Sequence, residues 1–406
     1  MSVRSVDLGR LCYNGQTLAQ DARSAMVVTA TTEKGAARGR LRPLDPAQDM
    51  GAIAQLIGSA FGDDMDSQGR AALRDLRWMA RLSPLVWWWA LADPSFRETY
   101  NGFVWEEVEG RRSLEKGLPH PIAADGNRLQ RKALHSTAVS PKGEGRRMVV
   151  GNVNLMPSPG SRYRWVICNV VVRQDYRRQG IARRLMEETI AEARRQAAEE
   201  VVLQVYRDNL AAMHLYTGLG FQEVAGEMGL RLAAVEPAAV LDAPGYELRP
   251  YQPAEEGGQL AYELASLVIP KTQQWLKPVR AAEYEPDWLT RMGWRLADLL
   301  AGRRRYRLMA FKGSEPAALM SVEASFRQRA HNLKLLIHPK HRGQLERMLI
   351  SRALSMLAGL PGQGVQATAI TDHTAAIQVL GEYGFREQRT LLTMSYRLTK
   401  TGSVDE

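Results

Sequence analysis

Residues 176–182, Tyr176-Arg177-Arg178-Gln179-Gly180-Ile181-Ala182, join an apolar segment to a helical pattern. The segment before them, 166–172, is rich in β-branched residues and contains no Gly or Pro, which predicts a buried strand. After them, apolar residues recur at helical spacing as far as Ala197. A glycine lets the backbone approach a ligand closely, and the first amides of a helix present unpaired N–H groups to an anion. The loop therefore predicts a phosphate site, although an ordinary turn with surface arginines fits it equally well.

The downstream sequence favours the phosphate site. Residues 201–206 read as a second strand, and a short helix follows over 209–216 before Gly220 and Phe221. The pattern N-x-x-A-x-x-x-Y-x-x-x-G-F, at this distance from the loop, resembles the GNAT acyltransferase superfamily. The resemblance covers residues 166–225 and is weaker elsewhere.

The resemblance implies that the loop binds the pyrophosphate of acetyl-CoA or another acyl-CoA, the co-substrate. The implied coenzyme contacts are Val170, Val172, Arg177, Arg178, Gln179, Gly180, Ile181, Ala182 and Asn209. It also implies that Tyr216 is the catalytic residue, the acid that protonates the departing thiolate. Tyr216 as a packing residue and Asn209 as a helix cap are the alternatives for these two positions.

A long internal repeat explains the length of 406 residues. Residues 41–47 recur as 248–254, and the pattern at 208–221 recurs as 372–385 with identical internal spacing. We therefore predict an α/β protein of two tandem GNAT-like domains, each a mixed, mostly antiparallel sheet flanked by helices, resembling mycothiol synthase in architecture. The predicted organisation is an extension over 1–38, a catalytic domain over 39–240 with a polar insertion near 106–146, a degenerate domain over 241–400 and a tail over 401–406.

The spacing of apolar residues places the elements of each copy. In the first, we expect strands near 39–44, 102–108, 147–155, 163–172, 201–206 and after 221, with helices near 50–62, 68–82, 181–197 and 209–217. In the second, we expect strands near 304–312, 316–325, 332–338 and 365–370, with helices near 343–358 and 374–383.

The second copy departs from the family pattern where chemistry is expected. Its loop, aligned as one residue shorter, places Gln344 opposite Gly180 and Glu346 opposite Ala182. A carboxylate about 5 Å from a phosphate, at an effective dielectric near 20, costs on the order of 3 kcal/mol. Leu380 stands opposite Tyr216, and His373 stands opposite Asn209. We therefore expect the second copy to bind no coenzyme, and to shape the acceptor site or stabilise the first copy.

The general base is not evident. The strand before the loop carries no Asp, Glu or His, so we expect a water relay, to which Glu106, Glu107 or His214 could contribute. Three consecutive tryptophans, Trp87-Trp88-Trp89, cannot all face one side of a regular element, so at least one is expected at a pocket or a domain contact.

Composition limits the classes of function. Two cysteines, no signal segment and no run of 18 apolar residues predict a reduced, cytoplasmic protein without a membrane anchor. No metal-binding cluster is visible. The net charge is +10, and residues 244–397 contribute +7 of it, from 5 Lys and 16 Arg against 14 acidic residues. The densest run, 303–307, lies at the start of a strand without a nucleic-acid motif, which favours a solvated basic face.

The leading interpretation is transfer of an acetyl or short acyl group to an amine of a small molecule or peptide. Two other classes fit the sequence less well: an acyl-CoA-binding sensor, and a module that docks a nucleic acid or acidic partner through the basic second copy. The fold does not choose the acceptor, because one scaffold of this family serves many amines.

Overall fold

The computed structural model describes residues 39–61, 74, 101–108, 147–253, 256–326, 330–362 and 364–398. The predicted N-terminal extension, Trp87-Trp88-Trp89 and the tail lie outside these ranges, as do most of the helix near 68–82 and most of the polar insertion. We call residues 39–240 the first half and residues 241–398 the second half.

The first half contains the elements expected of it in the described ranges. In chain order these are β1 (Arg40–Pro43), α2 (Pro46–Phe61), β2 (Gly102–Val108), β3 (Arg147–Ser158), β4 (Ser161–Val172), a 3-10 turn η1 (Gln174–Tyr176), α6 (Ile181–Arg195), β5 (Glu200–Tyr206), α7 (Leu210–Thr217) and β6 (Gln222–Leu232).

The second half repeats this order. Its elements are β7 (Glu247–Pro250), α8 (Glu256–Val268), α9 (Lys271–Gln274), η2 (Ala281–Glu283), α10 (Trp288–Ala301), β8 (Arg303–Lys312), β9 (Glu315–Ser325), β10 (His331–Ile337), η3 (Pro339–His341), α11 (Glu346–Leu357), β11 (Val365–Ile370), α12 (Thr374–Glu382) and β12 (Arg386–Arg397). The α/β class and the mixed, mostly antiparallel pairing are confirmed.

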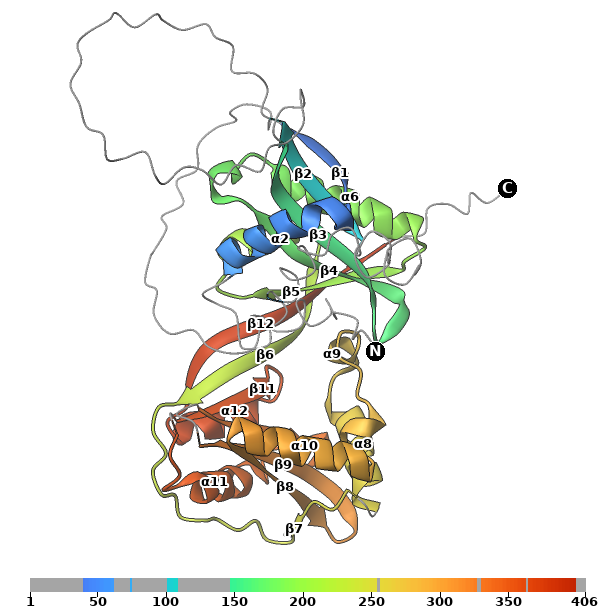
Figure 1. The fold of residues 1–406 in the computed structure, drawn as a ribbon. Coiled ribbons are helices and arrows are strands. Elements are labelled where there is room, and N and C mark those ends of the chain that lie inside the picture. Colours follow the sequence, from blue (N-terminus) through green and yellow to red (C-terminus); the bar gives the residue numbers. More distant parts are fainter. Residues whose placement is uncertain are drawn as a thin grey trace, which may run out of the picture.

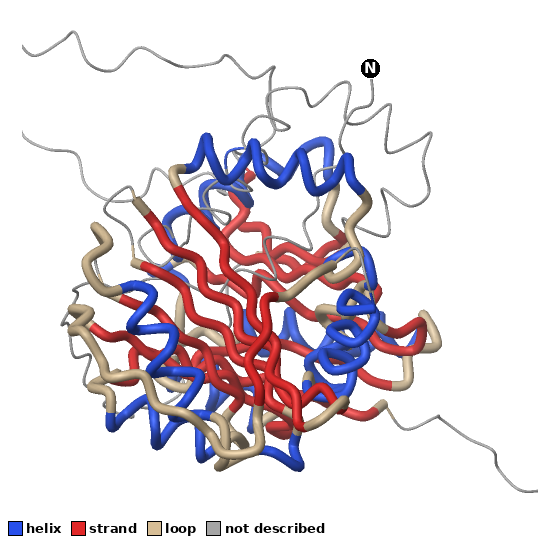
Figure 2. Tube along the Cα trace, turned by 90° about the horizontal axis from the view of Figure 1, so that it is seen from below, coloured by secondary structure: helices blue, strands red, loops and turns tan. Residues whose placement is uncertain are grey.

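The two halves share one sheet of twelve strands, in the order β1-β2-β3-β4-β5-β12-β6-β11-β10-β9-β8-β7. The last strand of each half is exchanged: β12 pairs with β5 of the first half, and β6 pairs with β11 of the second. The two exchanged strands also pair with each other and cross between the halves (Figure 1). Figure 2 shows the strands as a layer with helices outside it.

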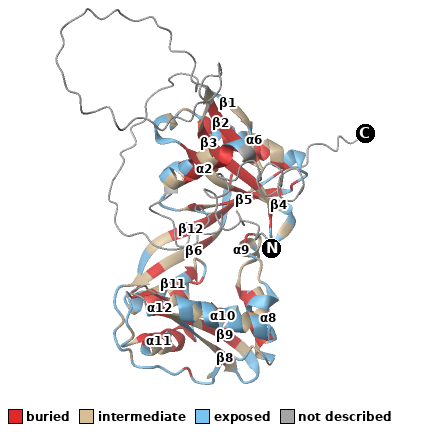
Figure 3. Cartoon of the chain, in the orientation of Figure 1, coloured by how far each residue is buried: buried red, intermediate tan, exposed pale blue. Residues whose placement is uncertain are grey.

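Each hydrophobic core contains side chains from the other half's strand. Leu392 and Met394 of β12 are 0 % and 2 % exposed within the core that packs under α6. Leu230 of β6 lies in the core that packs under α11 and α12. Figure 3 shows buried residues along the strands of both halves, whereas α10 is exposed over much of its length. Each half therefore depends on the other for a complete core.

A second contact joins the halves beside the exchanged strands. Both the Ser158 hydroxyl and the Gly160 amide donate to the carbonyl of Trp275, which follows α9. The guanidinium of Arg164 lies 4.1 Å from the centre of the Trp275 ring. Gly160 has no room for a side chain, because a Cβ there would lie 2.0 Å from the Gln274 carbonyl oxygen. The β3–β4 hairpin is thus fixed against the second half.

In the described ranges, every helix is too short or too polar to cross a lipid bilayer. Cys168 of β4 is disulfide-bonded in the structure, which differs from the reduced state predicted for the cysteines.

Candidate active site

The predicted loop at residues 176–182 forms a tight turn that opens α6. Gly180 caps the helix in the left-handed conformation with φ 75°, and Arg178 also has a positive φ of 62°. The amide of Arg184 donates to the Gly180 carbonyl at 3.1 Å, so the amides of Ile181, Ala182 and Arg183 precede the first helical hydrogen bond. These amides form the positive end of the helix dipole. The turn can therefore hold an anion.

Space and charge around the turn fit this role. A Cβ built on Gly180 would meet no atom within 4 Å. The side chain of Arg177 is held across the turn by a hydrogen bond of 3.1 Å from its Nε to the Val172 carbonyl. Arg178 is exposed, and Gln179 donates weakly to the Asp175 carbonyl at 3.4 Å. The loop residues predicted for the coenzyme lie together at the end of β4.

A β-bulge distorts β4 just before this loop. Asn169 has a positive φ of 53°, and the register between β3 and β4 shifts at this point. Three asparagines stabilise the bulge: Asn152 donates to the Asn169 carbonyl at 3.1 Å, and both Asn152 and Asn169 donate to Asn154 Oδ1 at 2.9 and 3.2 Å. Asn154 is buried, and the Oδ1 of Asn152 has no hydrogen-bond partner in the described part of the chain.

The bulge coincides with a separation of β4 from β5. The two strands pair in parallel only at residues 164–166 and 200–202, although β4 continues to Val172 and β5 to Tyr206. Beyond this point β5 supplies no partner for the β4 edge that carries Val170 and Val172. An extended ligand chain can pair with such an edge as an added strand would. The free edge leads directly to the loop.

Tyr216 lies near the end of α7, inside the first-half core. It is 6 % exposed, and its ring centre lies 6.0 Å from that of Phe221. Burial raises the pKa of its hydroxyl, which finds no hydrogen-bond partner among the described residues. The phenol is therefore fully protonated at neutral pH and has a proton to donate.

Asn209 caps α7, with its side chain accepting a hydrogen bond of 3.3 Å from the Ala212 amide. Asn209 is therefore a helix cap in the structure, which was the alternative to a coenzyme contact. The residue is exposed, so a capped Asn209 remains open to solvent at the helix start.

Comparison with known proteins agrees with this geometry. The sequence model of the acetyltransferase (GNAT) family matches residues 102–221, which include β2 to α7. Residues 102–221 are a GNAT-family domain. The loop, the separated strands and Tyr216 all lie within it.

Two curated proteins are similar to this chain over short segments. The [ribosomal protein bS18]-alanine N-acetyltransferase of Escherichia coli K12 is 42 % identical over 55 residues, which are 14 % of this chain and 37 % of that protein. N-alpha-acetyltransferase 30 of Saccharomyces cerevisiae is 37 % identical over 65 residues, 16 % of this chain and 37 % of that protein. The chain thus spans little more than a third of the length of these relatives. The crystal structure of a GCN5-related N-acetyltransferase from Sphaerobacter thermophilus has a TM-score of 0.49 at 14 % identity, covering 88 % of this chain and 95 % of that one.

The candidate bases of the GNAT domain are mostly engaged elsewhere. Glu106 is buried and forms ion pairs with Arg40 and Arg42 at 2.9 and 3.1 Å. Burial alone would raise the pKa of Glu106, but the hydrogen bonds from these arginines lower it, which makes Glu106 a weak base. Glu107 accepts a hydrogen bond from the Tyr176 hydroxyl. His214 is exposed on α7.

Two features of the structure were not predicted from the sequence. The asparagine network could have been suspected from Asn152 and Asn154, two polar residues at the same face of an apolar strand. Glu227 of β6 had no signal, because the position depends on strand exchange. Tyr206 and Glu227 pair with Leu391 from opposite sides, so the two side chains lie on the same face of the sheet. Burial raises the pKa of the Glu227 carboxyl.

The second-half loop has the same length as that of the GNAT domain, which corrects the alignment made from sequence. Leu345 precedes α11 as Gly180 precedes α6, and the Leu349 amide donates to the Leu345 carbonyl at 2.9 Å. Glu346 therefore lies opposite Ile181, not Ala182, and Gly343, with φ 81°, lies opposite Arg178. The second half is one residue shorter than the first between Glu346 and the start of α12, so the missing residue lies there.

The carboxylate of Glu346 fills its own loop. It accepts hydrogen bonds from the amides of Gly343 at 2.9 Å and Leu345 at 3.2 Å, and Nε2 of His373 lies 2.8 Å from its Oε1. Glu346 is 1 % exposed. Glu346 and His373, the two departures from the family pattern, therefore contact each other directly. Leu380 is buried in the second core.

Proposed function

We propose that this chain transfers an acetyl or short acyl group from acyl-CoA to an amine, and that the first half is the catalytic unit. The observation that carries the proposal is the turn at Gly180, whose open amides lie beside the free edge of β4. An acyl-CoA supplies an activated thioester and a pyrophosphate. The GNAT-family match of residues 102–221 supports the same reading.

The proposed coenzyme contacts come from the turn before α6, the edge of β4 and the start of α7. The amides of Ile181 and Ala182 and the side chains of Arg177 and Arg178 would hold phosphate oxygens, because they bring donors and positive charge to the open turn. The remaining contacts would come from Gln179 and Gly180 in the turn, Val170 and Val172 on the free edge, and Asn209 at the start of α7.

Tyr216 is the proposed acid. A thiolate that leaves a thioester needs a proton, and general acid catalysis of this kind is worth about 10² to 10⁴ in rate. Burial keeps the phenol protonated, which suits a donor. For the proton of the amine we propose a water relay, since Glu106 and Glu107 are held by other groups.

The acceptor is proposed only as an amine of a small molecule or peptide, acting in the cytoplasm. The Escherichia coli relative is named for an alanine of a ribosomal protein, which supports a peptide amine as one class to test. Nothing in the described structure favours a nucleic acid as the acceptor, and a basic surface alone is also expected of a protein with acidic ligands.

The deciding experiment replaces Gly180 with Glu. The side chain enters open space, so the protein should fold, while the new charge repels the pyrophosphate and lowers acetyl-CoA affinity more than about a hundredfold. Gly313→Glu is the matched control: Gly313 also has a positive φ, 63°, and no atom within 4 Å of a built Cβ, so it carries the same backbone strain and charge.

Calorimetry with acetyl-CoA measures the loss, and thermal unfolding of both variants checks the fold. Unchanged affinity in folded Gly180→Glu would overturn the proposed site. Release of free CoA thiol when amines are added separates catalysis from an acyl-CoA sensor: binding without amine-dependent release would leave only the sensor.

A further inference from the structure

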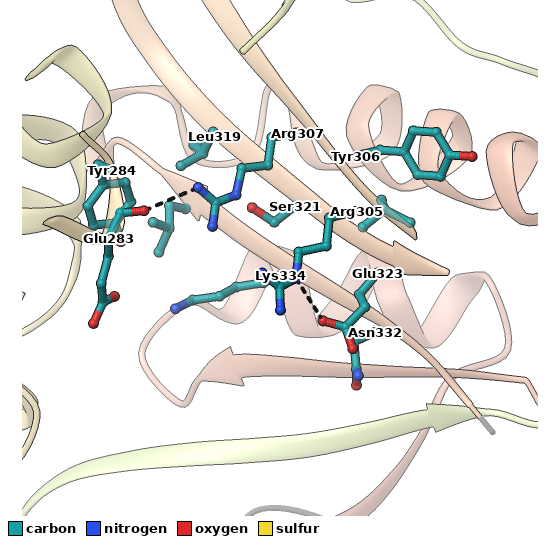
Figure 4. Close-up of a pocket in the computed structure, with 12 residues that line it drawn as sticks. Glu283, Tyr284, Arg305, Tyr306, Arg307, Leu319, Ser321, Glu323, Asn332 and Lys334 are labelled. Carbon is teal, nitrogen blue, oxygen red and sulfur yellow. Dashed lines mark hydrogen bonds and ion pairs between the residues drawn. The ribbon is translucent and has the colours of Figure 1, made fainter. Parts of the chain in front are cut away.

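A cavity of about 240 Å³ lies in the second half, on the sheet face that also carries α8. It is lined by side chains of β8, β9 and β10 and by Glu283 and Tyr284 from η2 and its end. Figure 4 shows Arg307, Ser321 and Lys334 across these three strands. The strand register agrees, because Ser321 pairs with Arg307 on one side and with Lys334 on the other.

Two of the cations in this cavity have no carboxylate partner in the part of the chain that the structure describes. The Arg307 guanidinium donates to the backbone carbonyl of Glu283 at 3.3 Å and lies over the Tyr251 ring. Lys334 forms no hydrogen bond or ion pair with any residue of the described ranges. Both are therefore free to bind a further group.

Arg305, the third cation of the cavity, does have carboxylate partners. Arg305 is neutralised by Asp298 at 3.1 Å and Glu323 at 3.4 Å. Glu323 also pairs with Arg303 at 3.4 Å, so this carboxylate is already shared. Glu283 brings a second carboxylate to the cavity wall, yet it forms no ion pair with a described residue. Among the described residues, no carboxylate thus forms an ion pair with Arg307 or Lys334.

The surroundings of Lys334 agree with this imbalance. Burial and the nearby Lys277 lower the pKa of its ammonium, despite the opposing effect of Glu227 and Glu283. An anion beside Lys334 would stabilise the charged ammonium. Within the described ranges, the charged form of this lysine has no ion-pair partner.

We propose that this cavity binds a small anionic group, a carboxylate or a phosphate, between Arg307 and Lys334 with Ser321 as a hydroxyl donor. Ser321 lies between the two cations, and its hydroxyl can donate to either kind of anion. The volume is below the usual range for drug-sized ligands, so it suits one acidic group and a few attached atoms. The second half would then be a binding unit that has lost its coenzyme loop to Glu346 and retained a ligand site on another part of its sheet.

The test uses the full chain carrying Gly180→Glu, so that anions cannot bind at the first-half loop. Inorganic phosphate and succinate are the probes, titrated by calorimetry in sodium chloride of matched ionic strength. We expect one equivalent of at least one probe to bind. Lys334→Met and Arg307→Gln should each weaken it by about tenfold or more, the size of a lost charge-assisted hydrogen bond.

Matched controls are Lys340→Met and Arg295→Gln, which remove the same charges from exposed positions of the second half and should bind as the parent does. Binding of phosphate alone assigns a phosphate-bearing ligand, and binding of succinate alone assigns a carboxylate. The proposal is overturned if neither probe binds, or if Lys334→Met binds as tightly as Lys340→Met. Lys334 makes no hydrogen bond or ion pair with a described residue, so that variant stays informative even if Arg307→Gln unfolds.

Discussion

The loops that open α6 and α11 have the same length, but the residue before the helix is left-handed at Gly180 and right-handed at Leu345, and only the first loop is open. No described side chain caps the amides that open α6, whereas the carboxylate of Glu346 accepts hydrogen bonds from the amides of Gly343 and Leu345. A carboxylate takes the place that an outside anion would occupy. Anion binding can thus be lost by internal replacement of the ligand while the fold is kept.

The strands before the two loops differ as well. In the first half β4 separates from β5 after Val166, and the bulge at Asn169 then interrupts the pairing of β3 with β4. In the second half β9 and β10 pair without a register shift, and β10 stays paired with β11 as far as Lys334, then continues to Ile337 without it. The edge left unpaired by the neighbouring parallel strand is therefore longer in the first half, where it leads to the open turn.

The largest effect is expected when the halves are separated. A chain ending at residue 240 lacks β12, whose Leu392 and Met394 complete the first core, and it leaves the edges of β5 and β6 unpaired. We expect no cooperative unfolding transition from it by circular dichroism in urea. A chain ending at Leu398, which retains β12, is the control and should unfold as the full chain does.

A native-like transition in the shorter chain would mean that the first half is complete without the exchange. Leu392→Ala then provides a finer measure: deletion of this fully buried side chain should cost about 2 to 5 kcal/mol, although Leu392 belongs to the second half by sequence.

The next largest effect is expected at Tyr216, which aligns with Leu380 of the second half. Tyr216→Phe should lower turnover by about 10² to 10⁴ with little change in acetyl-CoA affinity, because the hydroxyl is a proton donor and not a binding group. Tyr396→Phe is a suitable control, since Tyr396 also contacts Phe221, at 5.5 Å between ring centres. A Tyr216→Phe enzyme within about threefold of wild type would assign the tyrosine to packing.

The repeat and its elements could be predicted from the sequence, because apolar spacing and the recurrence of 208–221 as 372–385 are local properties. The exchange of β6 and β12 could not, since both strands have the same pattern and nothing local distinguishes one partner edge from another. The loop alignment failed for a related reason. The missing residue had no local signature, and it was placed before Glu346 when it lies after it.

The third prediction counts coenzyme sites. The full chain should bind one equivalent of acetyl-CoA, at the first-half loop, because Glu346 occupies the second and would repel the pyrophosphate at a cost on the order of 3 kcal/mol. Calorimetric titration of the full chain and of Gly343→Glu should each saturate at one equivalent. Two equivalents in the full chain, or a site lost in Gly343→Glu, would show that the second loop also binds coenzyme.

The smallest effect is the stability that Glu346 gives to the second half. Burial alone would raise the pKa of Glu346, but the hydrogen bonds from His373 and the Gly343 amide outweigh burial and lower it. A folded-state pKa below the unfolded value stabilises the protein above the unfolded pKa, about 4.3, and the contribution disappears as the pH falls through the folded value. Glu346→Gln should therefore lower the free energy of unfolding by about 1 to 3 kcal/mol at pH 7, and by less as the pH falls below about 4.

Urea unfolding across this pH range measures the difference, with Glu382→Gln as the control. Glu382 is a more exposed partner of Arg347, and a surface pair of this kind is worth about 1 kcal/mol or less. If Glu346→Gln cost the same at every pH, the shape of the side chain and not its charge would hold the loop. The negative charge would then not be what closes the second loop to phosphate, and the contrast with Gly180 would rest on the missing bulge alone.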